Sequence, residues 1–186
     1  MKAEEELAKK KAIAIYEKSK IFIKKEEFGN LESTDFGLGD FYNIGITVLI
    51  YINTKRVCAK EISLLPYQIC PQHKHPNKGK LLGKEETFRC RWGEVYLYLE
   101  GPETKKIKAK IPDKYKNKFT VFNEVILKPG DQYKLEPNID HWFQSGPEGA
   151  VLSEFSSHSD DKSDIFFNKN VNRKPIDNLD IYKLIK

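Results

Sequence analysis

Most of the chain consists of short apolar runs broken by turn-forming residues, a pattern typical of β-strands. From residue 36 onward we interpret these runs as strands: NIGITVLIYIN, VCAKEISLLP, QICPQHKH, EVYLYLEG, KKIKAKI, FTVFNEVILK, QYKLEP, HWFQSG and GAVLSEFS. Turns such as DFGLGD at 35–40, PG at 129 and GPEG at 146 separate them, and Thr54–Arg56 reads as the turn of a hairpin. Many short strands with regular breaks predict an all-β sandwich or small barrel.

Two segments depart from this pattern. Residues 3–20 predict a helix, because Ala8, Ala12, Ile15 and Tyr16 form one apolar stripe opposite a lysine-rich face. We expect this helix to pack outside the barrel or against a partner subunit. The stretch after Ser156 is polar and rich in turn formers, and we expect it to wrap back over the barrel before the terminal segment IDNLDIYKLIK.

The chain shows no internal repeat and no linker that would divide it. We therefore expect a single domain over residues 1–186. Its parts would be an N-terminal helical extension (1–35), a β-barrel core (36–156) and a C-terminal tail that packs on the barrel (157–186). A length of 186 residues and an apolar content of 39% are sufficient for one sizeable core.

Composition favours a cytoplasmic protein. No apolar run approaches the roughly 20 residues that cross a bilayer, and the start MKAEEELAKKK is too acidic and polar for a signal peptide. The cysteines Cys58, Cys70 and Cys90 are odd in number and lack CxxC spacing, which favours a reducing compartment over a disulfide framework. We expect no membrane partner.

The net charge of +5 comes mostly from lysines, which are densest in KKIKAKIPDKYKNK at 105–118. A nucleic-acid surface would be one interpretation of this segment. However, arginine and stacking aromatic residues are nearly absent there, and alternating lysines favour a solvated edge hairpin. We therefore expect no nucleic-acid partner.

Candidate chemistry begins at His73 and His75. Side chains alternate faces along a strand, so two histidines one residue apart project to the same side and can chelate a metal. A zinc site that also uses Cys70 is conceivable, but residues 70, 73 and 75 do not share one strand face.

The stretch PQHKHPNKGKLLGKEETFRCRWG resembles the first conserved motif of the cupin superfamily, which is His-x-His, then Glu, then Gly seven positions after that Glu. Glu86 and Gly93 keep this last spacing, which selects Glu86 over Glu85 as a ligand. The gap between the histidines and the glutamate is longer than in the usual motif, and we interpret it as an insertion loop at the metal mouth. The second cupin motif is approximated by KPG at 128–130 followed by His141, so three of the four histidines fall at cupin positions.

Within the superfamily, the chain resembles the D-lyxose isomerases over roughly residues 60–175, chiefly through the blocks GKEETFR and GAVLSEFSSHSDD. The resemblance implies a single jelly-roll-like cupin barrel, commonly a homodimer, that converts D-lyxose to D-xylulose and often D-mannose to D-fructose. It also implies a metal held by His73, His75, Glu86 and His141, with Mn²⁺ the usual ion. A mixed nitrogen and oxygen set with open positions suits Mn²⁺, Fe²⁺, Co²⁺, Ni²⁺ or Zn²⁺.

An aldose–ketose isomerase also needs a base that the metal does not saturate. Glu154 is our candidate, because Leu152, Glu154 and Ser156 share one strand face and the carboxylate can project into the barrel. Lys84 could stabilise charge on a sugar oxygen or assist proton transfer, although a solvated surface lysine is an equal alternative.

Weaker candidates for substrate binding complete the predicted site. Asp164 and Arg173 match charged positions in the family's tail, and Gln72 and Gln144 could bind sugar hydroxyls. His158 lies in a polar stretch and is expected to be exposed rather than a ligand.

Two other functions fit the same motifs. A cupin-type phosphoglucose isomerase would share the metal set but need a cationic pocket for phosphate. A non-catalytic sugar- or metal-binding cupin would bind ligand without turnover, although no helix-turn-helix segment that would mark a regulator is visible.

Overall fold

The structure is a computed structural model that describes residues 2–173, so the predicted terminal segment IDNLDIYKLIK lies outside the described residues. In chain order the elements are α1 (Lys2–Lys18), η1 (Lys25–Asn30), β1 (Glu32–Thr34), β2 (Ile46–Asn53), β3 (Cys58–Leu64), β4 (Ile69–Lys74), β5 (Glu86–Leu99), η2 (Asp113–Lys118), β6 (Asn123–Leu127), β7 (Gln132–Leu135), β8 (His141–Ser156), η3 (Asp161–Ser163) and β9 (Ile165–Phe166).

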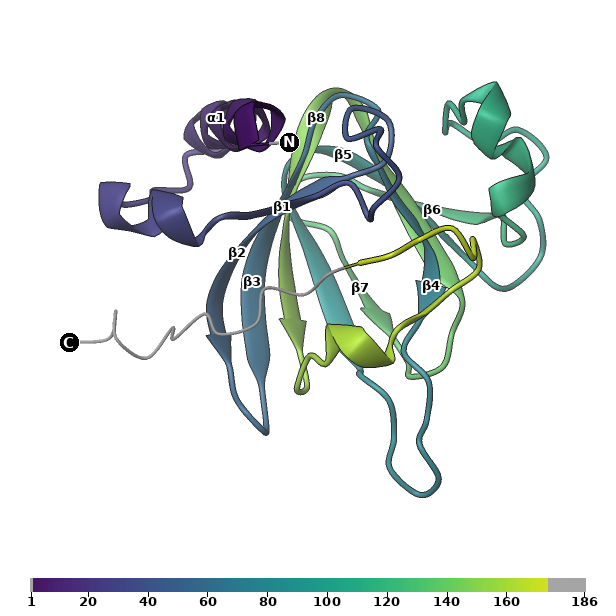
Figure 1. Ribbon diagram of the computed structural model, residues 1–186. Coiled ribbons are helices and arrows are strands. Elements are labelled where there is room, and N and C mark those ends of the chain that lie inside the picture. The colour runs from purple at the N-terminus through teal and green to yellow at the C-terminus, as the bar shows by residue number, and fades with distance from the viewer. Residues whose placement is uncertain (1, 174–186) are drawn as a thin grey trace.

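The strands form one antiparallel sheet that curls into a barrel (Figure 1). Its path runs β1-β2-β3-β8-β4-β9, and β5 pairs with β6, β7 and β8. The long strands β5 and β8 form its spine: the second half of β8 pairs with β3 and its first half with β4. The all-β, cupin-like barrel predicted from the sequence is confirmed.

The bend of the spine depends on glycine. The β5–β8 register shifts between Cys90 and Trp92 and again between Gly93 and Val95. Gly93 has a φ of 73°, and a Cβ at this position would overlap the carbonyl oxygen of Gly149. The two backbones therefore approach closely where the sheet turns the corner of the barrel.

Two details of the predicted strand pattern were wrong. The GPEG segment is not a turn between two strands, because β8 runs without interruption from His141 to Ser156. The lysine-rich stretch is not an edge hairpin either. Residues 105–112 form no strand, and η2 follows them. Gln144 holds this stretch, accepting a hydrogen bond from the backbone N of Lys110 at 2.7 Å and donating one to its O at 2.9 Å.

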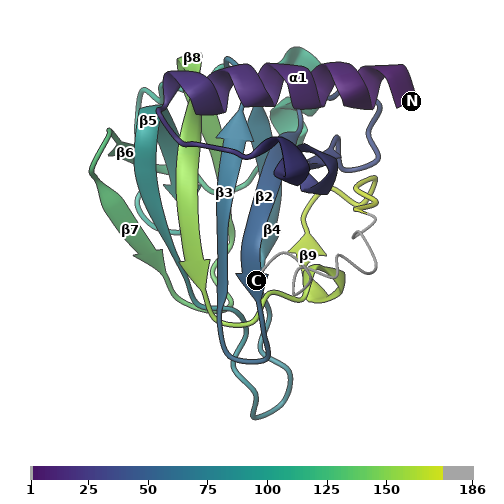
Figure 2. The same ribbon diagram turned by 90° about the vertical axis from the view of Figure 1, so that its left-hand side faces the viewer.

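The N-terminal helix packs against the outside of the barrel, across β2, β3 and β8 (Figure 2). The predicted stripe of Ala8, Ala12, Ile15 and Tyr16 is buried. Tyr16 also lies within hydrogen-bond distance of two backbone carbonyls of the sheet, on β2 and β3. No helix among residues 2–173 is long and apolar enough to span a membrane.

The described part of the tail crosses the mouth of the barrel (Figure 1). Strand β9 pairs with β4, placing Phe166 opposite His73, and the amide of Asn172 donates to the carbonyl of Phe36 at 2.8 Å. These bonds bring tail side chains to the end of the barrel where the histidines lie.

Candidate metal centre and active site

Three buried histidines converge at this end of the barrel. His73 lies on β4 and His75 just beyond it, while the β4–β8 register places His141 directly opposite His73. The potential ligand atoms of His73, His75 and His141 all lie within 4.8 Å of one another. Strand alternation explains the first pair, and strand pairing brings in the third.

The hydrogen bonds of these histidines determine which ring nitrogen is available to bind a metal. Each Nδ1 lies beside an oxygen acceptor: His73 with Pro71 O at 2.9 Å, His75 with Asp164 Oδ1 at 2.6 Å, and His141 with Ile139 O at 3.0 Å. An acceptor at Nδ1 requires that this nitrogen carry the proton, so a neutral ring keeps its lone pair on Nε2. This is the arrangement in which histidines bind metals.

Glu86, the first residue of β5, completes the cluster. Its Oε1 lies 3.4 Å from Nε2 of His75 and 3.1 Å from Nε2 of His141. These three atoms are buried, and none has a hydrogen-bond partner among the described residues. Converging buried acceptors without donors are costly, and a divalent cation would satisfy them together.

The charge states suit the same ion. Burial, together with the neighbouring His141 and His75, holds the pKa of His73 well below its usual value, so this ring is neutral. Burial alone would raise the pKa of Glu86, but Lys84 and His75 hold it well below its usual range. His73 and Glu86 are therefore in the forms that bind metals, a neutral imidazole and an ionised carboxylate.

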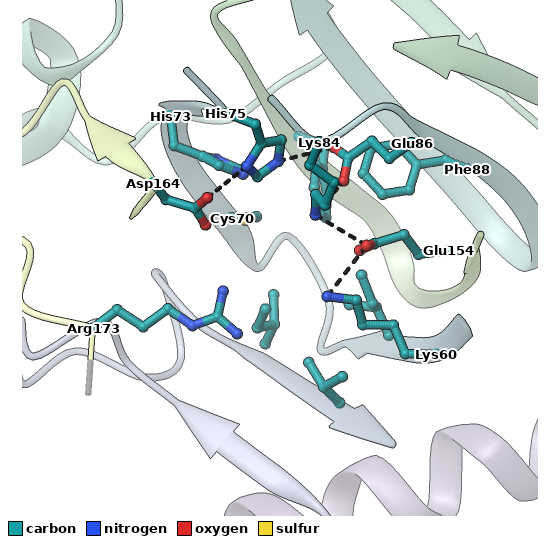
Figure 3. Close-up of a pocket in the computed structure, with 14 residues that line it drawn as sticks. Lys60, Cys70, His73, His75, Lys84, Glu86, Phe88, Glu154, Asp164 and Arg173 are labelled. Carbon is teal, nitrogen blue, oxygen red and sulfur yellow. Dashed lines mark hydrogen bonds and ion pairs between the residues drawn. The ribbon is translucent and has the colours of Figure 1, made fainter. Parts of the chain in front are cut away.

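A chain of opposite charges runs from this cluster into the cavity (Figure 3). Nζ of Lys84 lies 2.5 Å from Oε2 of Glu86 and 3.0 Å from Oε1 of Glu154. Lys84 is buried, so the solvated alternative is wrong. Burial would lower the pKa of Lys84, yet Glu154 and Glu86 raise it well above its usual value and keep it an ammonium.

Sequence reasoning missed Lys60. This residue of β3 is 5% exposed, and its Nζ lies 3.2 Å from Oε1 of Glu154. The available signal was strand alternation, since Lys60 shares a face with Cys58, Ile62 and Leu64 and is charged on an otherwise apolar face.

The tail supplies two further charged groups. Asp164 holds His75 through Nδ1, as described above, and its side chain is 4% exposed. Arg173 lies 2.7 Å from Asp161 Oδ2 and 3.5 Å from Glu32 Oε1, linking the tail to β1. Both predicted tail residues therefore reach the site, and their direct contacts are to protein groups.

These residues line one cavity at the mouth of the barrel. Its lining combines charged groups with apolar side chains of β2 and β3, and the charged residues are Lys60, Lys84, Glu86, Glu154, Asp164 and Arg173.

Other candidates lie elsewhere or play no part in the histidine cluster. The side-chain amide of Gln72 forms hydrogen bonds with Thr120 through both its nitrogen and its oxygen. The side chain of Gln144 bonds the backbone of Lys110. Neither glutamine lines this cavity. Cys70 lines the cavity but is not in the metal-binding cluster found among the described residues, and burial raises the pKa of its thiol. His158 is exposed and bonds the carbonyl of Thr54 at 2.7 Å, as expected for a residue outside the site.

Comparison with known proteins relates the chain to sugar isomerases. Residues 9–181 match the D-lyxose isomerase family. A D-lyxose ketol-isomerase from Thermofilum sp. is 54% identical over 90% of this chain and 93% of its own length. A D-lyxose/D-mannose isomerase from Thermosediminibacter oceani is 52% identical over 85% of this chain and 87% of its own.

Among solved structures, the L-ribose isomerase of Cellulomonas parahominis superposes with a TM-score of 0.73 at 14% identity, covering 91% of this chain and 93% of that one. At this identity the likeness concerns the fold. The family match and the close relatives establish more: this chain belongs to the D-lyxose isomerase family and is a sugar isomerase.

Proposed function

We propose that this protein is a divalent-metal-dependent isomerase that converts D-lyxose to D-xylulose and D-mannose to D-fructose. One observation carries the proposal. Buried metal-binding atoms of His75, His141 and Glu86 converge without hydrogen-bond partners among the described residues. They lie beside Glu154, whose carboxylate pairs only with ammonium and hydroxyl groups among the described residues. The names of the close relatives support both sugars. The two aldoses share their configuration at C2, C3 and C4, so one site accommodates both if it tolerates an extra carbon.

His73, His75, His141 and Glu86 would hold the ion, for which Mn²⁺ is our first candidate and Fe²⁺, Co²⁺, Ni²⁺ and Zn²⁺ are chemically suitable. When bound, the ion would supply Lewis-acid polarisation at the two oxygens on C1 and C2 of the open-chain sugar. Asp164 fixes the ring of one ligand, and the backbone carbonyls of Pro71 and Ile139 fix the others.

Glu154 would act as the base. It removes the proton from C2 of the aldose and delivers a proton to C1, while the proton on the C2 hydroxyl passes to the C1 oxygen. The products are a C2 carbonyl and a C1 alcohol, with no oxidant needed. Lys84, held between Glu86 and Glu154, would supply an ammonium that stabilises the negative charge developing on the sugar oxygens.

The charges of the cavity favour a neutral sugar over a sugar phosphate. Lys60 and Lys84 contact Glu154, and Arg173 contacts Asp161. A phosphoglucose isomerase would instead need cations free to bind a phosphate. Within the part of the chain that the structure describes, the lining cations Lys60, Lys84 and Arg173 are each paired with a carboxylate.

The test is turnover by purified protein that has been stripped with a chelator and titrated with Mn²⁺, using D-lyxose, D-mannose and glucose 6-phosphate. We expect ketose from the first two sugars only, and only with metal. Glu154→Gln should keep Mn²⁺ and sugar affinity but lower kcat by about 100-fold or more, whereas His158→Ala serves as a control that should change neither. Glu154→Gln with normal turnover would remove the base assignment, and tight metal binding without turnover of any sugar would favour the non-catalytic cupin.

Two further expectations rest on the family resemblance and the composition. We propose that the chain forms a homodimer and acts in the cytoplasm. Sedimentation of the purified protein tests the first, and fractionation of the source cells tests the second.

A further inference from the structure

Lys60 is an ammonium buried in an apolar part of the barrel wall. The β3–β8 register pairs Lys60 directly with Glu154, so the two side chains project from neighbouring strands on the same face. On its other side, Lys60 pairs with Ile50 of β2. A buried ammonium costs several kcal/mol in desolvation, so its pairing with Glu154 is the interaction that makes this position tolerable.

A second contact holds the ammonium from the tail. Nζ of Lys60 lies 3.3 Å from Oγ of Ser159, and that hydroxyl in turn donates to Oδ1 of Asp161 at 3.1 Å. Ser159 is itself fixed, because its backbone N and O both bond the side chain of Asn53 at the end of β2. The head of Lys60 is thus fixed between a strand and the tail.

The polar contacts of the Glu154 carboxylate fall on one of its two oxygens among the described residues. Its Oε1 lies within 3.0 Å of Lys84 Nζ, 3.2 Å of Lys60 Nζ and 3.3 Å of Ser156 Oγ. Among the described residues, every polar contact of this carboxylate falls on Oε1. Oε2 is therefore the oxygen left to exchange a proton with a substrate.

The two lysines are not equivalent. Lys84 is shared between Glu86 and Glu154, and its contact to Glu86 is the shorter. Lys60 contacts Glu154 as its carboxylate partner. An ammonium in contact with two carboxylates would restrain Glu154 less well than Lys60, whose ion pair within residues 2–173 is with Glu154.

We propose that Lys60 is a positioning residue for isomerisation, which holds Oε1 of Glu154 so that Oε2 faces the reacting carbons. This inference rests on the proposed function of Glu154 as the base. Lys60 acts through Glu154 and need not touch the sugar. A misplaced base lowers the rate of proton transfer without weakening substrate or metal binding.

The experiment compares Lys60→Met with Lys60→Arg in the Mn²⁺-loaded enzyme. Lys60→Met keeps a flexible apolar side chain of similar length but removes the charge, and we expect kcat to fall about 10- to 100-fold while KM for D-lyxose and Mn²⁺ affinity stay near the wild-type values. Lys60→Arg should recover part of kcat. With D-lyxose deuterated at C2, the isotope effect on kcat should be at least as large in Lys60→Met as in the wild type, since proton transfer becomes slower.

Ser159→Ala is a milder second variant, which keeps the ammonium of Lys60 and removes one of its contacts. We expect a smaller fall in kcat. If Lys60→Met does not fold, the kcat of Ser159→Ala tests the role of Lys60 instead. Full kcat in the folded variants, or a rise in KM alone, would overturn the role of Lys60 while leaving the proposed function intact. A wild-type protein that turns over no sugar would overturn the proposed function and, with it, this inference.

Discussion

Replacing Asp164 with alanine tests whether the tail helps to hold the metal. Asp164 Oδ1 lies 2.6 Å from Nδ1 of His75, in a site where the Asp164 side chain is only 4% exposed. In Asp164→Ala the ring loses the acceptor that fixes its orientation and its tautomer. His75 would then spend part of its time with the wrong nitrogen facing Glu86.

The expected loss follows from comparable partners of metal-bound histidines. Removing such a partner lowers metal affinity by about 10- to 100-fold, which corresponds to about 1.4–2.7 kcal/mol of binding free energy. Asp164→Asn should fall between the variant and the wild type, since the amide oxygen still accepts a hydrogen bond but carries no charge. The measurement is Mn²⁺ titration by calorimetry or by competition with a chromophoric chelator.

Asp160→Ala is the matched control. Asp160 is on the same tail and pairs with Lys78 at 3.1 Å, but both side chains are largely exposed, so this ion pair is worth at most about 1 kcal/mol. We expect Mn²⁺ affinity to be unchanged in this variant. Equal affinity in Asp164→Ala and wild type, or an equal loss in both variants, would refute the assignment of Asp164 to the metal site.

Three further outcomes are expected. Gly83→Ala should lower kcat by about 100-fold, because a Cβ there would overlap the carbonyl of His75 and displace Lys84; circular dichroism checks that the variant folds. Burial and Lys84 would lower the pKa of His75, but Glu86 and Asp164 raise it above its usual value. Mn²⁺ affinity should therefore fall as the pH drops through this pKa, because a proton then competes with the metal for the ring. Asp161→Asn should lower the free energy of unfolding in urea at pH 7 by about 2 kcal/mol, and less at pH 2.

The sign of the last effect follows from the Asp161 pKa. Burial alone would raise this pKa, but Arg173 and Lys60 lower it from 3.8 to about 2. A carboxyl whose pKa is depressed by folding stabilises the protein above its unfolded value, and this contribution disappears as pH falls from about 4 to about 2. Equal losses at pH 7 and pH 2 would show that the charge of Asp161 is not the cause.

The parts of the site that were predictable are those that local sequence encodes. One intervening residue places His73 and His75 on one face of a strand, and the same alternation directed Glu154 into the barrel. The helix over Ala8 to Tyr16 was equally predictable, because a 3.6-residue period of apolar side chains involves only residues close in the sequence.

The parts that were missed depend on contacts between distant segments. Lys60 reads as an ordinary lysine until the β3–β8 register sets it beside Glu154. The lysine-rich stretch was misread for the same reason. Its alternation suggested a strand. However, the side chain of Gln144, which is 34 residues away, forms hydrogen bonds with the backbone N and O of Lys110, so these groups do not pair with a strand. Likewise Gly146 and Gly149 predicted a turn, whereas they lie within β8 near the bend of the barrel.

The location of Asp164 and Lys60 also implies that metal binding and tail docking are coupled. Asp164 joins the tail to His75, a proposed metal ligand, and Ser159 joins it to Lys60, the lysine that contacts Glu154. If docking of the tail raises metal affinity by fixing His75, then metal binding must favour the docked tail by the same factor, because coupling between two equilibria is reciprocal. Mn²⁺ should therefore slow amide exchange in residues 159–166 of the wild-type protein, and this protection should diminish in Asp164→Ala, even at Mn²⁺ concentrations that saturate the variant.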